Sequence, residues 1–328
     1  MAILNKLLPV PLALLMWGCY EDFTPKVDSR PVLCLNSLIT AGEPVEVEVT
    51  RTWLFTDEGA AADHGVVDAT VAVYANGLAV GRGYIAREGD RIRIEADSPR
   101  YGHAEAEVTV PFSVVPSCVS LAATNVSVWR GPIQGWTEVD MSFDLNVGLA
   151  VSDPAATVNY YHLAWQIYLD DGPDIYGHEI SFYGGTLETE FEPIFSEHIS
   201  ELDAVSGNDS WGFTFFTDRQ FSGRTYTLHL CNKGARYSIA CEGFDPAWLD
   251  CGLVFTLSTV SESYYNWAVY KWNTDNGLAG DLADIGLGDP LRGYSSVSTG
   301  AGVVAARTTS ECAVSIAPIL KDYVYPSD

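Results

Sequence analysis

The feature that most restricts the fold of this chain is a series of short runs in which apolar and polar residues alternate. Residues 91–96 read RIRIEA, residues 104–110 read AEAEVTV, and turn formers such as Asn76-Gly77 separate runs of this kind. Alternation with a period of two places apolar side chains on one face of a β-strand. We therefore predict a mostly β protein.

The runs fall into two parts of different character. Six or seven short strands within 31–112 predict an N-terminal Ig-like or transthyretin-like β-sandwich, and Pro111 and Pro116 indicate a linker after it. The runs in 118–328 are longer and more aromatic, which predicts a larger C-terminal β-sandwich. Only 261–273, with its Ser cap and helical spacing, predicts a short α-helix, and a Gly-rich loop and a terminal strand are expected after it.

The N-terminus has the build of a secretory signal peptide that ends before a cysteine. Residues 1–18 contain one charge, at Lys6, then an apolar run over 7–17 and a small residue, Gly18, directly before Cys19. This arrangement resembles the lipobox of bacterial lipoproteins, in which the peptide is cut before a diacylated cysteine. We predict that Cys19 is the lipidated N-terminus of the mature protein.

The residues after Cys19 favour a membrane anchor that faces the cell surface. The apolar run is too short for a bilayer, which needs about 20 residues, so the protein is expected to sit on a membrane through its lipid. Residues 19–30 form an acidic tether whose Glu21 and Asp22 resemble the surface-export signal of Bacteroidota lipoproteins. The alternative is that these two carboxylates only solvate the tether.

Charge excludes one class of partner. After removal of 1–18 the chain has 17 basic and 43 acidic residues, a net charge of −26. The phosphate backbone of nucleic acid requires a basic surface, so we predict no nucleic-acid partner.

Cysteines other than Cys19 predict disulfides. An even number of cysteines in an exported chain favours bridges, although sequence alone leaves their pairing open. Zinc is the rival interpretation, but no CxxC or HxxxH spacing is present. The possible disulfide residues are Cys34, Cys118, Cys231, Cys241, Cys251 and Cys312.

Two further patterns carry little chemistry. The carboxylates of Asp170, Asp171 and Asp174 are a weak calcium candidate, since the spacing of an EF-hand is absent and such residues are ordinary in turns. The GAGVVA segment at 300–305 satisfies a dinucleotide pattern, but too little chain follows it, so we expect a turn before the last strand. We predict no metal site and no cofactor.

Aromatic residues in turn-rich segments are the best candidates for binding. Trp129, Trp136, Phe244 and Trp248 flank or occupy polar loops, where large rings are costly to expose without a partner. The alternative is that they seal the ends of the sandwich. The aromatic residues of 261–273 are expected to pack the helix onto the sheet.

Four segments resemble one family. They are SDPAATVNYYHL at 152–163, FTDRQFSGRTYTL at 216–228, TVSESYYNW at 259–267 and GYSSVSTGAGVVAA at 293–306. In order and spacing they are similar to the Bacteroidota lipoproteins known as domain of unknown function 4249. The resemblance implies an outer-membrane lipoprotein, often encoded beside a TonB-dependent transporter, and it supplies no catalytic residues.

These observations favour binding over catalysis. No set of nucleophile, base and orienting group can be named from the sequence, so a hydrolase is the least favoured function. We expect a surface-exposed, non-enzymatic accessory or ligand-capture partner of a TonB-dependent outer-membrane barrel. A cell-surface adhesion or assembly module is the alternative.

Overall fold

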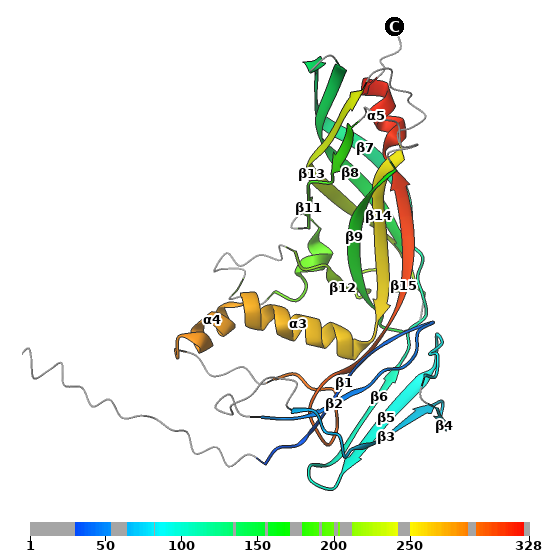
Figure 1. Ribbon diagram of the computed structural model, residues 1–328, viewed down its shortest axis with the longest axis vertical. Coiled ribbons are helices and arrows are strands. Elements are labelled where there is room, and N and C mark those ends of the chain that lie inside the picture. Colours follow the sequence, from blue (N-terminus) through cyan, green and yellow to red (C-terminus); the bar gives the residue numbers. More distant parts are fainter. Residues whose placement is uncertain are drawn as a thin grey trace, which may run out of the picture. The chain divides into compact units, whose positions relative to one another are not determined.

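The computed structural model describes residues 30–53, 64–81, 83–133, 136–154, 157–170, 179–189, 192–199, 203, 212–241, 250–287 and 293–324. In these ranges the protein is mostly β, as predicted, with three sheets and three α-helices (Figure 1). From Val32 onward the chain forms one compact unit. No helix within the described ranges is long and apolar enough to cross a bilayer.

A six-stranded sheet joins the first strand of the described chain to the last. In order across the sheet its strands are β12 (Phe215–Thr217), β9 (Tyr160–Asp170), β14 (Asp250–Val260), β15 (Val304–Ser315), β1 (Leu33–Thr40) and β2 (Glu48–Arg51). β1 runs parallel to the first residues of β15, from the pair Ser37–Val304 to the pair Thr40–Arg307. Segments from both sides of the predicted linker therefore share one sheet.

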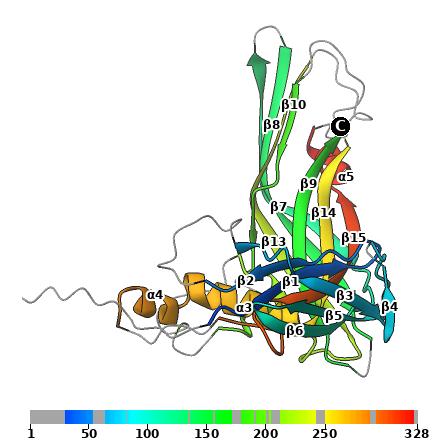
Figure 2. The same cartoon turned by 60° about the horizontal axis from the view of Figure 1, so that its bottom comes forward.

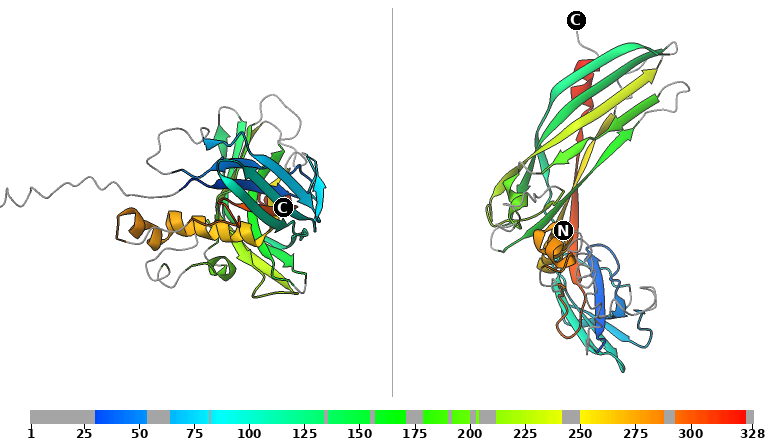
Figure 3. Two further views of the ribbon diagram at one scale, coloured as in Figure 1. Left: turned by 90° about the horizontal axis from the view of Figure 1, so that it is seen from below. Right: turned by 90° about the vertical axis from the view of Figure 1, so that its left-hand side faces the viewer.

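The other two sheets are each formed from neighbouring parts of the chain. The five-stranded sheet contains β10 (Glu179–Tyr183), β13 (Thr225–Cys241), β8 (Trp136–Ser152), β7 (Ser117–Ile133) and β11 (Thr186–Glu188), which also pairs with β13. The four-stranded sheet contains β4 (Leu78–Val80), β3 (Thr70–Ala75), β5 (Arg91–Ser98) and β6 (Gly102–Thr109). Figure 3 shows the long strands β7, β8 and β13 side by side.

Alternation along the strands builds the first core. On β5, Ile92, Ile94 and Ala96 are fully buried, while Arg93 and Glu95 between them are directed to the other face. The buried residues pack with Leu33 and Leu35 of β1, and Figure 2 shows β1 next to β3 and β5. Three residues from near the C-terminus complete this core: Val297, Val304 and Ala306.

The second core lies between the five-stranded sheet and β9, β14 and β15. Its largest fully buried side chains include Tyr161, Phe255 and Tyr237. On β13 the inward positions shift at a bulge between Asn232 and Ala235, where Gly234 adopts a φ of 69°. A positive φ at this bulge suits glycine, and the extra residue restores the inward orientation of the strand beyond it.

One helix was predicted, and the described chain contains three. α3 (Glu262–Asn276) confirms the prediction near 261–273, and the Ser261 side chain accepts a hydrogen bond from the Tyr264 amide at its start. α4 (Leu278–Asp284) lies where a Gly-rich loop was expected. α5 (Ala317–Val324) follows β15 and buries Ala317 and Leu320 in the second core, a tertiary contact without a local sequence signal. A short 3-10 helix, η3 (Pro193–Ser196), precedes β12.

Candidate functional site

Strand registers bring the segments predicted to bind to one end of the five-stranded sheet. The β7–β8 hairpin turns between Ile133 and Trp136, and Cys241 at the end of β13 pairs with Thr137 beside this turn. β10 begins at the same end, and β9 and β14 meet there in the pair Asp170–Asp250. Figure 2 shows β8 and β10 reaching this end together. We call it the distal end and define it by its described residues, which are 129–133, 136, 137, 170, 179, 241 and 250.

Several predicted site residues lie outside the described residues. They are Cys19, Asp171, Asp174, Phe244 and Trp248. Trp136, Asp170 and Cys241 are placed as backbone within strands, but their side chains are not described. The distal end therefore gathers the strand ends that flank the predicted segments, and Trp129 is the one candidate aromatic whose side chain the structure describes.

Trp129 lies on the outer face of β7. Its side chain is 53% exposed, and a Cβ atom added to Gly131 would lie only 2.5 Å from the indole, so the ring covers this glycine. Arg130, which points to the other face, donates a hydrogen bond from Nη2 to the carbonyl oxygen of Tyr323 on α5, at 2.6 Å. Because α5 packs on the core and Trp129 faces away from it, this indole does not seal the core.

The predicted disulfide framework is not found among the cysteines that the structure describes. Cys34, Cys118, Cys231 and Cys312 are free thiols. Cys34 is on β1, Cys231 is a half-buried residue of β13, and Cys251 is fully buried in the second core. Burial raises the pKa of the Cys118 thiol, with a smaller contribution from Cys312 nearby, so this thiol is held in its neutral form.

The structure also contains an aromatic groove that the sequence analysis did not anticipate. It lies between α3 and the segment that enters β12, and has a volume of about 340 Å³. We define the groove by its lining residues: His162, Gly212, Phe213, Thr214, Phe215, Trp267, Ala268, Lys271, Trp272, Asp275 and Asn276. The helix aromatics were expected to be core residues, but Trp267 is 37% exposed.

Ring contacts fix one wall of the groove. His162 stacks on Phe215 with ring centroids 4.1 Å apart, and His198 lies against Phe213 at 3.7 Å. Phe213 in turn contacts Trp272 at 5.3 Å. Burial lowers the pKa of both His162 and His198 to about 4, so both imidazoles are neutral at physiological pH. His162 is on β9, and the sheet face it occupies lines the groove.

Two of the family-like segments are joined beneath this region by a buried carboxylate. Asp153 Oδ1 accepts hydrogen bonds from the Tyr161 hydroxyl and from Asn159 Nδ2, the latter at 3.0 Å. Its Oδ2 accepts one from the Gly223 amide at 2.9 Å. Asp153 is 7% exposed and Tyr161 is fully buried. These residues of 152–163 and 216–228 therefore act as a structural clasp, which we call the Asp153 clasp.

The other two family-like segments hold the start of α3 against β15. Ser261 Oγ accepts a hydrogen bond from the Ala306 amide at 3.0 Å, and Ser263 Oγ donates to the Val304 carbonyl at 2.9 Å. Added Cβ atoms at Gly300 and Gly302 would lie 2.5 and 2.2 Å from backbone oxygens of β1. Glycine is thus needed for close packing against β1, and the expected turn before the last strand is confirmed.

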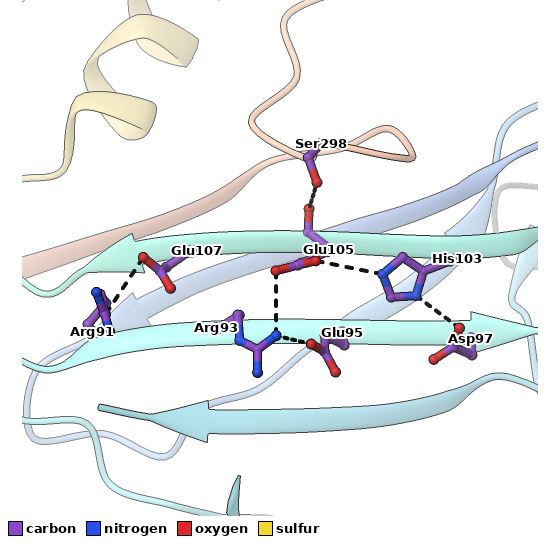
Figure 4. A network of polar contacts seen from close by, with 8 residues as sticks. All are labelled: Arg91, Arg93, Glu95, Asp97, His103, Glu105, Glu107 and Ser298. Atoms are coloured by element: carbon purple, nitrogen blue, oxygen red, sulfur yellow. Dashed lines mark hydrogen bonds and ion pairs between the residues drawn. The ribbon is translucent and has the colours of Figure 1, made fainter. Parts of the chain in front are cut away.

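A row of charged residues covers the outer face of β5 and β6 (Figure 4). Arg93 bonds Glu95 and lies 3.6 Å from Glu105, and His103 Nδ1 is 2.9 Å from Asp97. The hydrogen bond to Asp97 raises the pKa of His103, aided by Glu105. These are exposed cross-strand pairs, which contribute little individually. Among the described residues, no cluster of three or more His, Cys, Asp or Glu side chains has the geometry to hold a metal ion.

Comparison with known proteins identifies a family but no characterised relative. No curated protein and no solved structure matches the chain. The family described as "Domain of unknown function (DUF4249)" matches residues 20–312, beginning directly after Cys19. This match covers most of the sequence and contains all four family-like segments. The chain therefore belongs to the DUF4249 family.

Proposed function

We propose that this protein is a surface-exposed outer-membrane lipoprotein that works, without catalysis, as an accessory and ligand-capture partner of a TonB-dependent transporter. It is held to the membrane by a lipid on Cys19, and its strands form two β-sandwich-type domains, one around each core. The observation that carries the proposal is the gathering of the predicted recognition segments at the distal end.

The distal end is far from the strand that follows the proposed lipid anchor, which suits contact with a membrane partner. β1, which follows the tether, pairs with the first four residues of β15, whereas the distal end adjoins the last residues of that strand through the pair Gly252–Ser315. At about 3.3 Å per residue, these two parts of β15 are roughly 30 Å apart. The distal end therefore projects away from the strand to which the tether leads.

The chemistry of the distal end suits a protein partner. Trp129 presents a large exposed ring whose conformation is limited by Gly131, and exposed aromatic residues often dominate the binding energy of protein interfaces. At this end β8 is paired on both sides with the long strands β7 and β13, which makes a rigid base.

Purification from the native membrane tests the association. After mild chemical crosslinking, we expect a TonB-dependent barrel to be recovered with the wild-type protein, and Trp129→Ala to reduce that recovery about tenfold, as loss of an interface anchor does. Trp53→Ala is the matched control, because Trp53 is 47% exposed and lies outside the distal end. Recovery of the protein without a barrel would reject the proposal and favour the adhesion alternative.

A further inference from the structure

The aromatic groove presents two rows of side chains from one helix. Trp267, Lys271 and Asp275 recur every four residues along α3, and Ala268, Trp272 and Asn276 form a parallel row. Residues with this spacing share one helix face. Tyr265, which is 9% exposed, and Ala268 are the buried residues of α3. Trp267 is not one of them, and at 37% exposure part of its ring is open to solvent.

The rim of the groove is polar but carries no net charge. Lys271 Nζ lies 2.8 Å from Asp275 Oδ2, and the two charges compensate each other. Asn276 adds an amide, and the neutral imidazole of His162 lies on the opposite wall. An anionic ligand would meet no unpaired cation here, and the chain as a whole is strongly acidic, with a net charge of −25. A neutral ligand fits this rim best.

A buried imidazole lies beside the groove. His198 lies behind Phe213, and its Nε2 atom is buried with no hydrogen-bond partner among the described residues. A separate cavity of about 10 Å³ beside it is lined in part by Trp272 and Asn276, which also line the groove. Leaving a buried polar atom without a partner costs about 1–3 kcal/mol, and this cavity has room for one water molecule as that partner.

We propose that the aromatic groove binds a neutral sugar, with one pyranose ring stacked on Trp267. A pyranose combines an apolar face of C–H groups, which packs on aromatic rings, with hydroxyl groups that both donate and accept hydrogen bonds. The groove offers both features, and its volume of about 340 Å³ is at the lower end for ligand pockets, which suits one or two rings. The proposal specifies the ligand class for the ligand-capture role proposed above.

Titration of the purified, detergent-solubilised chain with neutral disaccharides tests the inference. The probes are maltose, cellobiose, lactose and N,N′-diacetylchitobiose, observed by saturation-transfer NMR. We expect at least one to bind. Trp267→Ala is expected to weaken it about tenfold through loss of the stacking surface, and Lys271→Met to weaken it less. Trp129→Ala at the distal end is the control and should bind as the wild type does. Near-UV circular dichroism verifies that each variant is folded.

Three outcomes would overturn the sugar assignment. The first is that no disaccharide binds at 10 mM, which is on the order of the weakest affinity worth assigning. The second is binding that Trp267→Ala leaves unchanged. The third is displacement of the sugar signal only by the tripeptide Gly-Trp-Gly, which would assign the groove to an aromatic peptide. Because the titration uses the protein without a barrel, its failure leaves the transporter association to its own test. Failure of that association would not change the titration.

Discussion

The distal end and the aromatic groove both expose tryptophan, but the surrounding structure holds the two rings in different ways. Trp129 lies on the outer face of a strand and packs against Gly131. Trp267 is on a helix whose start is hydrogen-bonded to β15, opposite a wall of stacked rings. The groove is thus organised before a ligand arrives, whereas the distal end is an open surface that a large partner can cover.

Substitution in the Asp153 clasp is expected to have the largest effect on stability. Asp153→Ala would leave the buried Tyr161 hydroxyl and the Gly223 amide without their acceptor, and we expect a loss of about 4 kcal/mol in the free energy of unfolding. Asp144→Ala is the control, because Asp144 accepts from Asn125 and Gly234 in a more exposed position, and should cost about 1 kcal/mol. Urea denaturation measures both. Equal losses would show that the clasp has no special role beneath the groove.

Acid is expected to lower the stability of the folded protein through the two buried histidines of the groove region. The pKa of His162 and of His198 is about 4 in the folded protein and about 6.5 in the unfolded chain, so the unfolded chain binds more protons between these values. Stability should therefore fall by a few kcal/mol as the pH decreases from about 6.5 to about 4.

Replacing both imidazoles isolates their contribution. The double variant His162→Phe, His198→Phe keeps a ring against each phenylalanine partner and should flatten the dependence of the melting temperature on pH over this interval. His103→Phe is the control on an exposed site, where the pKa shift has the opposite direction. A pH dependence that the double variant leaves unchanged would place the titrating groups elsewhere.

The cysteines that the structure describes on β1, β7, β13 and β15 should not be bridged to one another. Cys34, Cys118, Cys231 and Cys312 are free thiols. We expect denatured, unreduced protein to release at least these four thiols. Titration with a thiol reagent after rapid denaturation counts them. A count below four would mean that some of these cysteines are bridged.

The smallest expected effect is that of Trp129 on stability. Trp129→Ala removes a ring that is half exposed and outside both cores, so the free energy of unfolding should change by less than about 1 kcal/mol. Thermal unfolding monitored by circular dichroism measures the change. A loss as large as that expected for Asp153→Ala would show that Trp129 is a structural residue after all.

Alternation predicted the strands well, because the buried and exposed faces of a half-buried strand appear directly in its local sequence pattern. β5 and β6 lie within about two residues of the runs that predicted them, and the Ser cap located α3. The parallel pairing of β1 with β15 was not predictable, since it joins residues about 270 positions apart through backbone bonds. α5 was not predicted for a similar reason, because its burial against the second core is a long-range contact.

The distal end was predictable from local sequence, whereas the groove depends on contacts between distant residues. Turn-rich segments with large aromatics pointed to Trp129, and strand order alone would bring such loops to one end. The groove depends on Phe213, which contacts both Phe215 and Trp272, and the three residues look like ordinary core positions in the sequence. Trp267 gave no local signal, because helical spacing alone cannot distinguish an exposed ring from a buried one.

Site-specific photo-crosslinking in living cells tests the central claim most directly. A photoreactive phenylalanine analogue replaces Trp129 in one strain and Trp53 in another, and membranes are irradiated before solubilisation. The account predicts a covalent adduct with a TonB-dependent barrel from position 129 and none from position 53. Irradiation that yields no barrel adduct at position 129, or equal adducts at both positions, would contradict it.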